Sequence, residues 1–412
     1  MQCRSLILEK REFAALCGTV HSALRPPLRI PRTVWVLGLV SLFMDVSSEI
    51  IHALLPLFLT TTLGASVAMV GLIDGAAEST ASIVKVFSGY LSDRIGRRKP
   101  LILLGYALAA FSKPLFPLAN AAMLVFGARF ADRIGKGLRG APRDALVADV
   151  TPAAIRGRAF GLRQALDTTG AVLGPLLAIA LMALFANDMR AVFWVAAIPA
   201  GLSVLCVVFG VEDRAPEPGV SKALAPVHFR DIARFGRSFW AVVVSGVVFT
   251  LARFSEAFLI LKASAEGLPL ALAPLVLVAM NVVYSVGAYP AGALSDSLRA
   301  SNLLLCGVAA LIAADLSLAF APGIAGAFLG IALWGVHLAL TQGLLAKLVA
   351  DSAPETLRGS AFGLFNLATG LALLVASVIA GLVWDRLGPA ATFLTGAGFA
   401  AGAGVLLLIA RV

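Results

Sequence analysis

The chain reads Gly89-Tyr90-Leu91-Ser92-Asp93-Arg94-Ile95-Gly96-Arg97-Arg98-Lys99-Pro100 between two long apolar segments, residues 66–91 and 100–119. Lys and Arg concentrate in loops on the cytoplasmic side of a membrane, which explains the cations of this stretch. The same rule does not explain Asp93 or the glycines. Gly89 allows neighbouring helices to approach closely, and Gly96 permits a turn without a Cβ penalty. The stretch therefore predicts a short loop between two membrane-spanning helices.

Apolar segments of spanning length recur along the whole chain of 412 residues, which is 59% hydrophobic and 14% charged, with a mean hydropathy of +0.93. A bilayer core requires about 20 apolar residues per helix. The segments that meet this length cover residues 33–60, 66–91, 100–119, 122–142, 159–184, 190–211, 238–262, 269–294, 302–320, 324–349, 360–384 and 389–410. We therefore predict an all-α membrane protein of twelve transmembrane helices, arranged as six plus six.

The polar segments set the predicted domain boundaries. Residues 1–32 form a basic tail without the uninterrupted apolar core of a secretory signal, and residues 212–237 form a proline-containing linker. The two six-helix bundles then comprise residues 33–211 and 238–412. Basic residues fall in alternate loops on the side of the tail, so the positive-inside rule and the even helix count place both termini in the cytoplasm. We expect a multi-pass protein of the plasma (inner) membrane.

An internal repeat supports the division into halves independently of hydropathy. Residues of the loop between the fourth and fifth spans recur at one constant spacing in the loop between the tenth and eleventh. The matched pairs include Asp149 with Asp351, Pro152 with Pro354, Arg156 with Arg358 and Gly161 with Gly363. Chance similarity between apolar helices would not place Asp, Pro and Arg in register, so the halves are structural repeats. Many transporters are built this way, with the solute site near mid-membrane between the repeats.

The loop at residues 89–100 resembles the GxLxDRxGRR signature of the major facilitator superfamily, and residues 292–296 resemble a degraded second copy. The resemblance covers essentially the whole chain and implies the fold of two six-helix bundles and transport by alternating access. It also implies that Asp93 pairs across the halves with cations and with the positive N-terminus of the eleventh helix near Gly359 and Ser360. The gating residues that the motif implies are Gly89, Asp93, Arg94, Gly96, Arg97 and Arg98.

Two further stretches resemble elements of the same superfamily. In the fifth span, Gly161, Gly170, Gly174 and Pro175 resemble the antiporter motif of facilitator-type exporters. Small residues at this spacing let a helix pack tightly against its neighbour, and a proline bends it. In the fourth span, Arg133 begins a stretch that is similar to the RxxQGxG element of the family, with a lysine in place of the glutamine. These resemblances favour export and suggest that Arg133 assists proton coupling.

Ionisable residues in the middle of the bilayer cost about 2.5–3.5 kcal/mol each on insertion scales, so each needs a partner or a wet cavity. The first half is rich in such residues, and the second half has fewer. In the first span three of them recur on one helix face, and in the second span Asp74, Glu78 and Lys85 do the same. We therefore place substrate binding and proton coupling in the first half, at Asp45, Glu49, His52, Asp74, Glu78, Arg129, Asp132, Arg133 and Asp167.

Two roles compete for these groups. Carboxylates desolvated in a pocket can carry a proton at neutral pH, which suits Asp45, Glu49 or Glu78 as the coupling site. Arg129 and Arg133 stay charged and would hold an anionic group of the solute, or the carboxylates themselves. In a third interpretation the charged residues only satisfy one another as a buried network. Such pairs contribute little stability, which argues against that interpretation for the whole set.

A metal site is a weaker alternative. Asp45, Glu49 and His52 offer oxygen and nitrogen ligands on one helix, suited to a transition metal with help from a second helix. We expect no metal and no cofactor, with the proton gradient as the energy source. The four cysteines show no CxxC pair, so we expect no disulfide framework either.

The sequence therefore predicts a secondary active transporter, with proton-coupled export of a small organic molecule as the leading hypothesis. Transport of a transition-metal ion or a metal–siderophore chelate is the alternative within the class, and a non-transporting receptor or scaffold is the alternative outside it. We expect no enzyme, because HExxH, GxSxG and P-loop patterns are missing from the sequence. The expected partners are the small-molecule substrate and the lipid bilayer. Despite the net charge of +10 we expect no nucleic acid, and we expect a monomer.

Overall fold

The computed structural model describes residues 29–152, 155–212, 235–297, 299–353 and 358–410. Within these residues every regular element is helical, which confirms the predicted fold class. Residues 1–28 of the predicted tail and residues 213–234 of the predicted linker lie outside the described residues.

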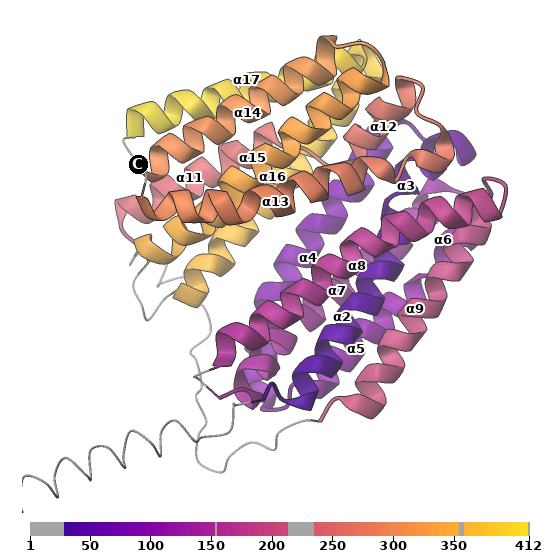
Figure 1. Cartoon of the computed structure of the whole chain (residues 1–412), viewed down its shortest axis with the longest axis vertical. Coiled ribbons are helices and arrows are strands. Elements are labelled where there is room, and N and C mark those ends of the chain that lie inside the picture. Colours follow the sequence, from indigo (N-terminus) through magenta and orange to yellow (C-terminus); the bar gives the residue numbers. More distant parts are fainter. Residues whose placement is uncertain (1–28, 153–154, 213–234, 298, 354–357, 411–412) are drawn as a thin grey trace, which may run out of the picture.

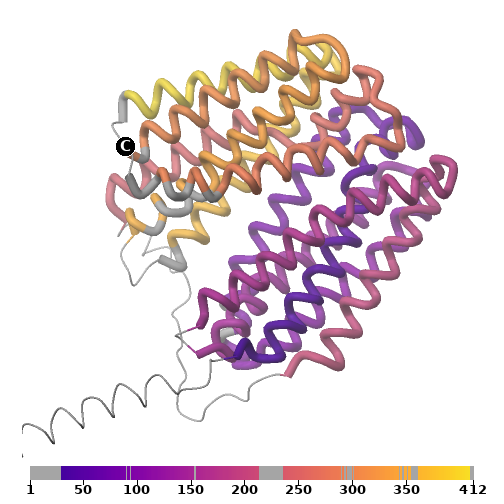
Figure 2. The backbone as a smooth tube through the Cα atoms, in the orientation of Figure 1, coloured from indigo at the N-terminus to yellow at the C-terminus, as the bar shows by residue number. Residues whose placement is uncertain are grey.

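The helices form two bundles (Figures 1 and 2). The N-terminal bundle comprises α2 (Arg32–His52), α3 (Leu55–Leu57), the π-helical turn η1 (Phe58–Thr62), α4 (Val67–Ile95), α5 (Lys99–Ser112), α6 (Leu115–Leu118), α7 (Ala122–Val150), α8 (Arg156–Leu184) and α9 (Met189–Gly210). The C-terminal bundle comprises α11 (Arg237–Ala252), α12 (Ala257–Ala265), the 3-10 turn η3 (Leu270–Leu272), α13 (Leu275–Ser297), α14 (Ala300–Phe320), α15 (Gly323–Ser352), α16 (Arg358–Leu387) and α17 (Pro389–Ala410).

Eleven helical segments among the described residues are long and apolar enough to cross a bilayer. The remaining predicted span, residues 122–142, is also helical and lies within α7. This helix carries too many charges to qualify as an apolar span, among them Arg129, Asp132 and Arg133. These three side chains are almost completely buried in the protein. The fourth span therefore belongs in the bundle interior, because other helices shield its charged face from lipid.

Among the described residues, the first, third and seventh spans are interrupted in their interior. The first span breaks after His52, where Pro56 lacks the N–H that would continue the helical hydrogen bonds. The third breaks near Lys113, which precedes Pro114. The seventh breaks between α11 and α12 at residues 253–256, where the backbone N–H of Ala257 donates to Ser255 Oγ at 3.1 Å. Each break leaves polar backbone and side chains inside the bundle, which is tolerated where they are buried in protein or line a cavity.

The two bundles contact each other mainly through α4 and α16. We call the end of the molecule that carries Arg94, Arg97 and Arg98 the basic end, and the end with α3, α12 and the start of α4 the opposite end. A Cβ built on Gly381 would lie 2.6 Å from Ala68 Cα near the opposite end. A Cβ on Gly363 would lie 3.4 Å from the nearest atom of Val86, nearer the basic end. The two helices therefore approach most closely toward the opposite end.

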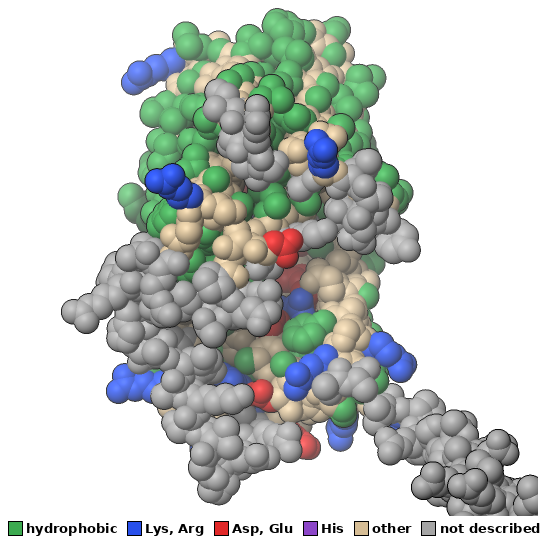
Figure 3. All heavy atoms as spheres, turned by 90° about the vertical axis from the view of Figure 1, so that its left-hand side faces the viewer, with side chains coloured by type: hydrophobic (Ala, Val, Ile, Leu, Met, Phe, Trp, Pro, Cys, Tyr) green, Lys and Arg blue, Asp and Glu red, His purple; other side chains and the backbone are tan. Residues whose placement is uncertain are grey.

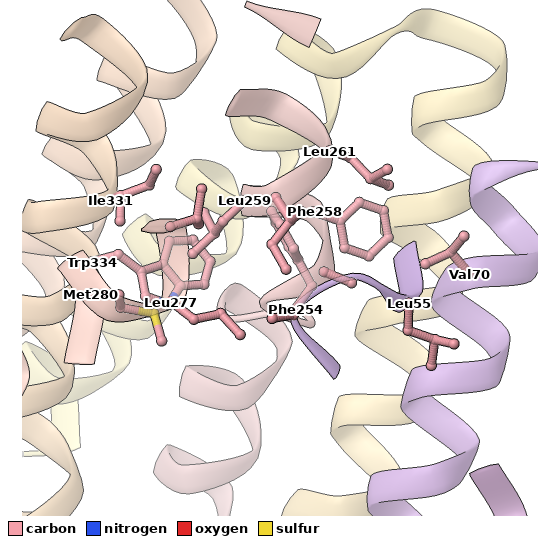
Figure 4. Close-up of a cluster of buried hydrophobic side chains, with 14 of the residues drawn as sticks. Leu55, Val70, Phe254, Phe258, Leu259, Leu261, Leu277, Met280, Ile331 and Trp334 are labelled. Carbon is pink, nitrogen blue, oxygen red and sulfur yellow. The ribbon is translucent and has the colours of Figure 1, made fainter. Parts of the chain in front are cut away.

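A cluster of apolar side chains closes the opposite end. Phe258 and Leu261 of α12 lie beside Leu55 of α3 and Val70 of α4, so residues of both bundles meet in this cluster (Figure 4). Phe254, at the break of the seventh span, packs edge-on against Phe258 with ring centroids 5.2 Å apart. Toward the basic end the bundles separate, and acidic and basic side chains are visible inside a hollow on this face (Figure 3). The structure is therefore open toward the basic end.

Candidate functional site

Two adjoining cavities lie between the bundles. The larger, about 450 Å³, is lined by residues of α2, α4, α7 and α8 and by Asn281 and Tyr284 of α13. The second, about 320 Å³, shares Glu49, Glu78 and Lys136 with the first and extends to the break of the seventh span. Most of the charged side chains that line both cavities come from the N-terminal bundle. Since substrate sites of repeat-built transporters lie between the repeats, these cavities are the candidate binding site.

The first charged cluster joins the two bundles through Asp74. Arg129 Nη2 donates to Asp74 Oδ1 at 2.8 Å, and His52 Nε2 lies 3.9 Å from the same oxygen. The hydroxyl of Ser255, from the break of the seventh span, donates to the other carboxylate oxygen, Asp74 Oδ2. Three of the predicted residues therefore meet here. Ser255 was not predicted, because its position beside a helix break is not visible in the sequence.

The second cluster surrounds Asp132 and Arg133. Arg133 Nη1 lies 3.2 Å from Glu78 Oε1, and Arg133 Nε lies 3.5 Å from Asp132 Oδ2. Lys113 Nζ donates to Asp132 Oδ1 at 2.8 Å and to Ser48 Oγ at 2.9 Å. Sequence reasoning missed Lys113, although a lysine within an apolar span, next to a proline, was a usable signal. The buried cations and carboxylates of this cluster compensate one another.

The third cluster lies around the larger of these two cavities, toward the basic end. Arg163 Nη1 donates to Asp167 Oδ2 at 2.6 Å, and Arg143 Nη1 lies 3.7 Å from Asp167 Oδ1. Asp45 faces the same cavity. Among the described residues, the Asp45 carboxylate has neither an ion pair nor a hydrogen bond. Asp45 is therefore the predicted carboxylate whose protonation would break no ion pair.

The alternative metal site finds no support in this geometry. His52 Nδ1 lies 3.5 Å from Glu49 Oε2. Its Nε2 lies 3.9 Å from Asp74 Oδ1. Within the described ranges, no group of three or more His, Cys, Asp or Glu side chains is arranged to hold a metal ion.

The glycines of the fifth span differ in their surroundings. A Cβ at Gly170 would lie 3.0 Å from Asp45 Cβ, and a Cβ at Gly174 would lie 2.5 Å from Glu49 Cβ. These two glycines therefore allow α8 to pack directly behind two acidic residues of α2. A Cβ at Gly161 would meet nothing within 4 Å, which differs from the expected close packing. Pro175 lies inside α8 and is buried.

The predicted gating loop lies at the basic end. Gly96 ends α4 in the left-handed conformation, with φ of 68°, and Gly89 faces Ala141 of α7. Arg94 and Arg97 are exposed. Arg98 donates to Ser92 Oγ at 2.7 Å and lies 3.3 Å from Asp149. The side chains of Asp93 and Ser360 are outside what the structure describes, so the expected pairing across the halves stays a prediction.

Two six-helix bundles with a charged cavity between them are the architecture of a multi-pass membrane transporter built from repeats. The sequence profile of the Major Facilitator Superfamily matches residues 37–373 and 261–412, and the chain belongs to this superfamily. Transport rather than catalysis is the activity of this class.

Relatives and solved structures agree with this assignment. An uncharacterized MFS-type transporter of Methanocaldococcus jannaschii is 31% identical over 385 residues, covering 92% of this chain and 95% of its own length. The multidrug resistance protein MdtH of Proteus mirabilis is 30% identical over 160 residues, 39% of this chain and 38% of its own. Among solved structures, a POT family transporter in complex with 5-aminolevulinic acid has a TM-score of 0.75 at 14% identity, covering 92% of this chain and 96% of its own. The nucleoside transporter NupG has a TM-score of 0.73 at 13% identity, covering 92% of this chain and 98% of its own. At these identities the structures support the fold alone.

Proposed function

We propose that this transporter exports a small organic compound in exchange for protons. The observation that carries the proposal is Asp45, a carboxylate that faces the larger of the two cavities between the bundles without an ion-pair partner among the described residues. Such a group can bind and release a proton without breaking an ion pair. Glu78 and Asp74 cannot, because Arg133 and Arg129 hold them.

The surroundings of Asp45 support an exchange mechanism. Gly170 and Gly174 bring α8 against α2 directly behind Asp45 and Glu49. A shift of one helix against the other would therefore change the environment of both carboxylates. Asp167, on the same helix α8, lines the cavity beside Asp45 and adds negative charge there. A solute or a proton at Asp45 would thus act directly on the packing of α2 against α8.

Orientation and direction belong to the same proposal. The positive-inside rule places the basic end, and with it both termini, in the cytoplasm of a plasma (inner) membrane. The cavity then opens to the cytoplasm in this structure, where an exported compound would enter. The similarity to MdtH, a multidrug resistance protein, over 160 residues supports export. We propose that a monomer suffices, because the cavities are lined by one chain.

Transport into everted membrane vesicles tests the proposal. Vesicles that contain the protein are given a panel of organic compounds, with and without nigericin to abolish the pH gradient. We expect accumulation of at least one compound that nigericin removes and that Asp45→Asn abolishes. Asp351→Asn is the matched control, since Asp351 is an exposed carboxylate at the end of α15. Accumulation that persists in Asp45→Asn with unchanged nigericin sensitivity would contradict the role of Asp45.

A further inference from the structure

A third cavity, about 290 Å³, lies entirely within the C-terminal bundle. Its walls come from α11, α15 and α16, and three phenylalanines, Phe249, Phe362 and Phe365, supply its aromatic surface. His337 stacks on Phe249 with ring centroids 6.3 Å apart, and its Nδ1–H donates to the carbonyl oxygen of Gly307 at 2.8 Å. The imidazole is therefore fixed in place as part of the aromatic wall. A pocket of this size and lining suits a single aromatic ring.

Arg253 is the charged residue of this third cavity. No Lys, Asp or Glu side chain is among its described lining residues, in contrast to the two cavities between the bundles. Arg253 also lines the second cavity, so its guanidinium lies where the aromatic cavity meets the charged one. Within the described residues, Arg253 has no side-chain hydrogen bond and no ion pair within 4 Å. Its position at the break of the seventh span leaves the guanidinium available to a ligand.

We infer that the third cavity binds the aromatic ring of an amphipathic organic anion whose carboxylate pairs with Arg253. The inference rests on the proposed function, because it names the class of solute that the transporter would carry. A guanidinium presents two parallel N–H donors that match a carboxylate. Glu256, three positions later, lines the second cavity but not the third, so a carboxylate placed on the aromatic side of Arg253 does not share a cavity with it. Polar Asn366 and Gln342 complete the wall without adding charge.

Equilibrium binding to the purified protein in detergent tests this inference without requiring transport. The probes are 3-phenylpropionate, its neutral amide, and 3-phenylpropylamine, which share a ring and differ in charge. We expect the carboxylate to bind at least about tenfold more tightly than the other two, as expected when a charge-assisted hydrogen bond is gained. We expect Arg253→Gln to remove this preference and Arg253→Lys to retain part of it. Arg237→Gln, an exposed arginine at the start of α11, is the matched control.

Every outcome of the binding experiment either supports or overturns the inference. Equal affinity for the three probes, preferred binding of the amine, or an unchanged preference in Arg253→Gln would overturn the inference. Proton-coupled accumulation of neutral or cationic compounds in vesicles would then leave the proposed function standing. Conversely, carboxylate binding that depends on Arg253, without nigericin-sensitive transport, would support the site and reject proton-coupled export.

An independent observation concerns the opposite end. The carboxylate of Asp385, near the end of α16, accepts hydrogen bonds from the backbone N–H groups of Val67 at 3.0 Å and Ala68 at 2.9 Å. These are the first residues of α4, so a carboxylate of one bundle caps the positive helix end of the other. The contact lies beside the close approach of Gly381 to Ala68.

We propose that Asp385 is a latch that holds the opposite end closed. When the bundles rock so that the opposite end opens, these two hydrogen bonds must break. Removal of the carboxylate should therefore favour the state that is open at the opposite end. Asp188 provides a matched comparison, because its carboxylate caps α9 within the N-terminal bundle, accepting from Arg190 N at 2.9 Å and Ala191 N at 3.3 Å.

Distance measurement by double electron–electron resonance tests the latch. Nitroxide labels at Thr62 and Ala265, two exposed positions at the opposite end on different bundles, report its opening. We expect Asp385→Ala to add a population at longer distance and Asp188→Ala to leave the distribution unchanged. A distribution in Asp385→Ala identical to that of the parent, or the same change in Asp188→Ala, would overturn the proposal.

Discussion

Helices α7 and α15 occupy corresponding places in the two bundles but have opposite chemistry. The constant spacing that relates Asp149 to Asp351 relates Arg129 to Ile331 and Asp132 to Trp334. In α7 the buried face is a chain of ion pairs, and in α15 the matching positions are buried apolar residues. Both helices are long and pack in similar surroundings, so the fold tolerates either ion pairs or apolar side chains on the buried face. The repeat therefore specifies the architecture, whereas most charged residues of the candidate site lie in the N-terminal repeat.

Removal of a cation from α7 should cause the largest loss of stability. Arg129→Met leaves Asp74 with only the hydroxyl of Ser255 and the more distant His52, and loss of one member of a buried ion pair is costly. We expect the free energy of unfolding in mixed micelles to fall by about 3 kcal/mol or more, with loss of transport. Ile331→Met at the matching position of α15 should cost less than about 1.5 kcal/mol. Equal losses in the two variants would show that the ion pairs of α7 contribute no more than ordinary packing.

Lys113 and Asp315 provide a second matched pair, at corresponding positions of the third and ninth spans. Lys113 is bonded to Asp132 and Ser48, whereas neither carboxylate oxygen of Asp315 has a hydrogen-bond partner in the part of the chain that the structure describes. Lys113→Met should cost about 2 kcal/mol, because it leaves Asp132 short of a donor. Asp315→Asn should change stability by less than about 0.5 kcal/mol, since no bond is lost. Thermal unfolding of the two variants in detergent distinguishes them, and a larger loss in Asp315→Asn would reverse this ranking.

Two glycines of α8 allow a comparison of packed and unpacked positions within one helix. Gly174→Ala places a methyl group 2.5 Å from Glu49 Cβ, so α8 and α2 must move apart at a cost of about 1–2 kcal/mol. Gly161→Ala meets nothing within 4 Å and should stabilise the helix by up to about 1 kcal/mol. Unfolding in mixed micelles measures both. The opposite order of stabilities would mean that α8 does not pack on α2 as described.

The smallest effect is expected at Glu266, which joins the end of α12 to the start of α15. The pKa of its carboxyl group is lowered by hydrogen bonds from Lys262 and from the backbone N–H of Gly323. A lowered pKa in the folded protein stabilises it above the ordinary glutamate pKa of about 4.3, and this contribution is lost as the pH falls through the lower value. Glu266→Gln should therefore cost less than about 1 kcal/mol at pH 7. The difference from the parent should shrink below pH 4; a constant difference would exclude an ionic contribution.

Much of the fold could be predicted from the sequence, because membrane spans are long and the repeat is in register. The fourth span was found even though its charges, including Arg129 and Asp132, exclude it from a purely apolar criterion. The side-chain partners could not be predicted in the same way. Ser255 and Lys113 lie at helix breaks, and Asp385 contacts a residue more than three hundred positions away. Such contacts depend on how the bundles dock, which hydropathy and spacing do not encode.

We propose that coupling resides in the N-terminal bundle, at Asp45, a carboxylate without an ion-pair partner among the described residues. Proton flux in proteoliposomes containing pyranine tests it most directly, with a transported compound identified in vesicles added to start the exchange. We predict that Asp45→Asn binds the compound but abolishes compound-driven proton movement, whereas Asp315→Asn, in the C-terminal bundle, retains it. Proton movement that survives in Asp45→Asn and is lost in Asp315→Asn would contradict the account.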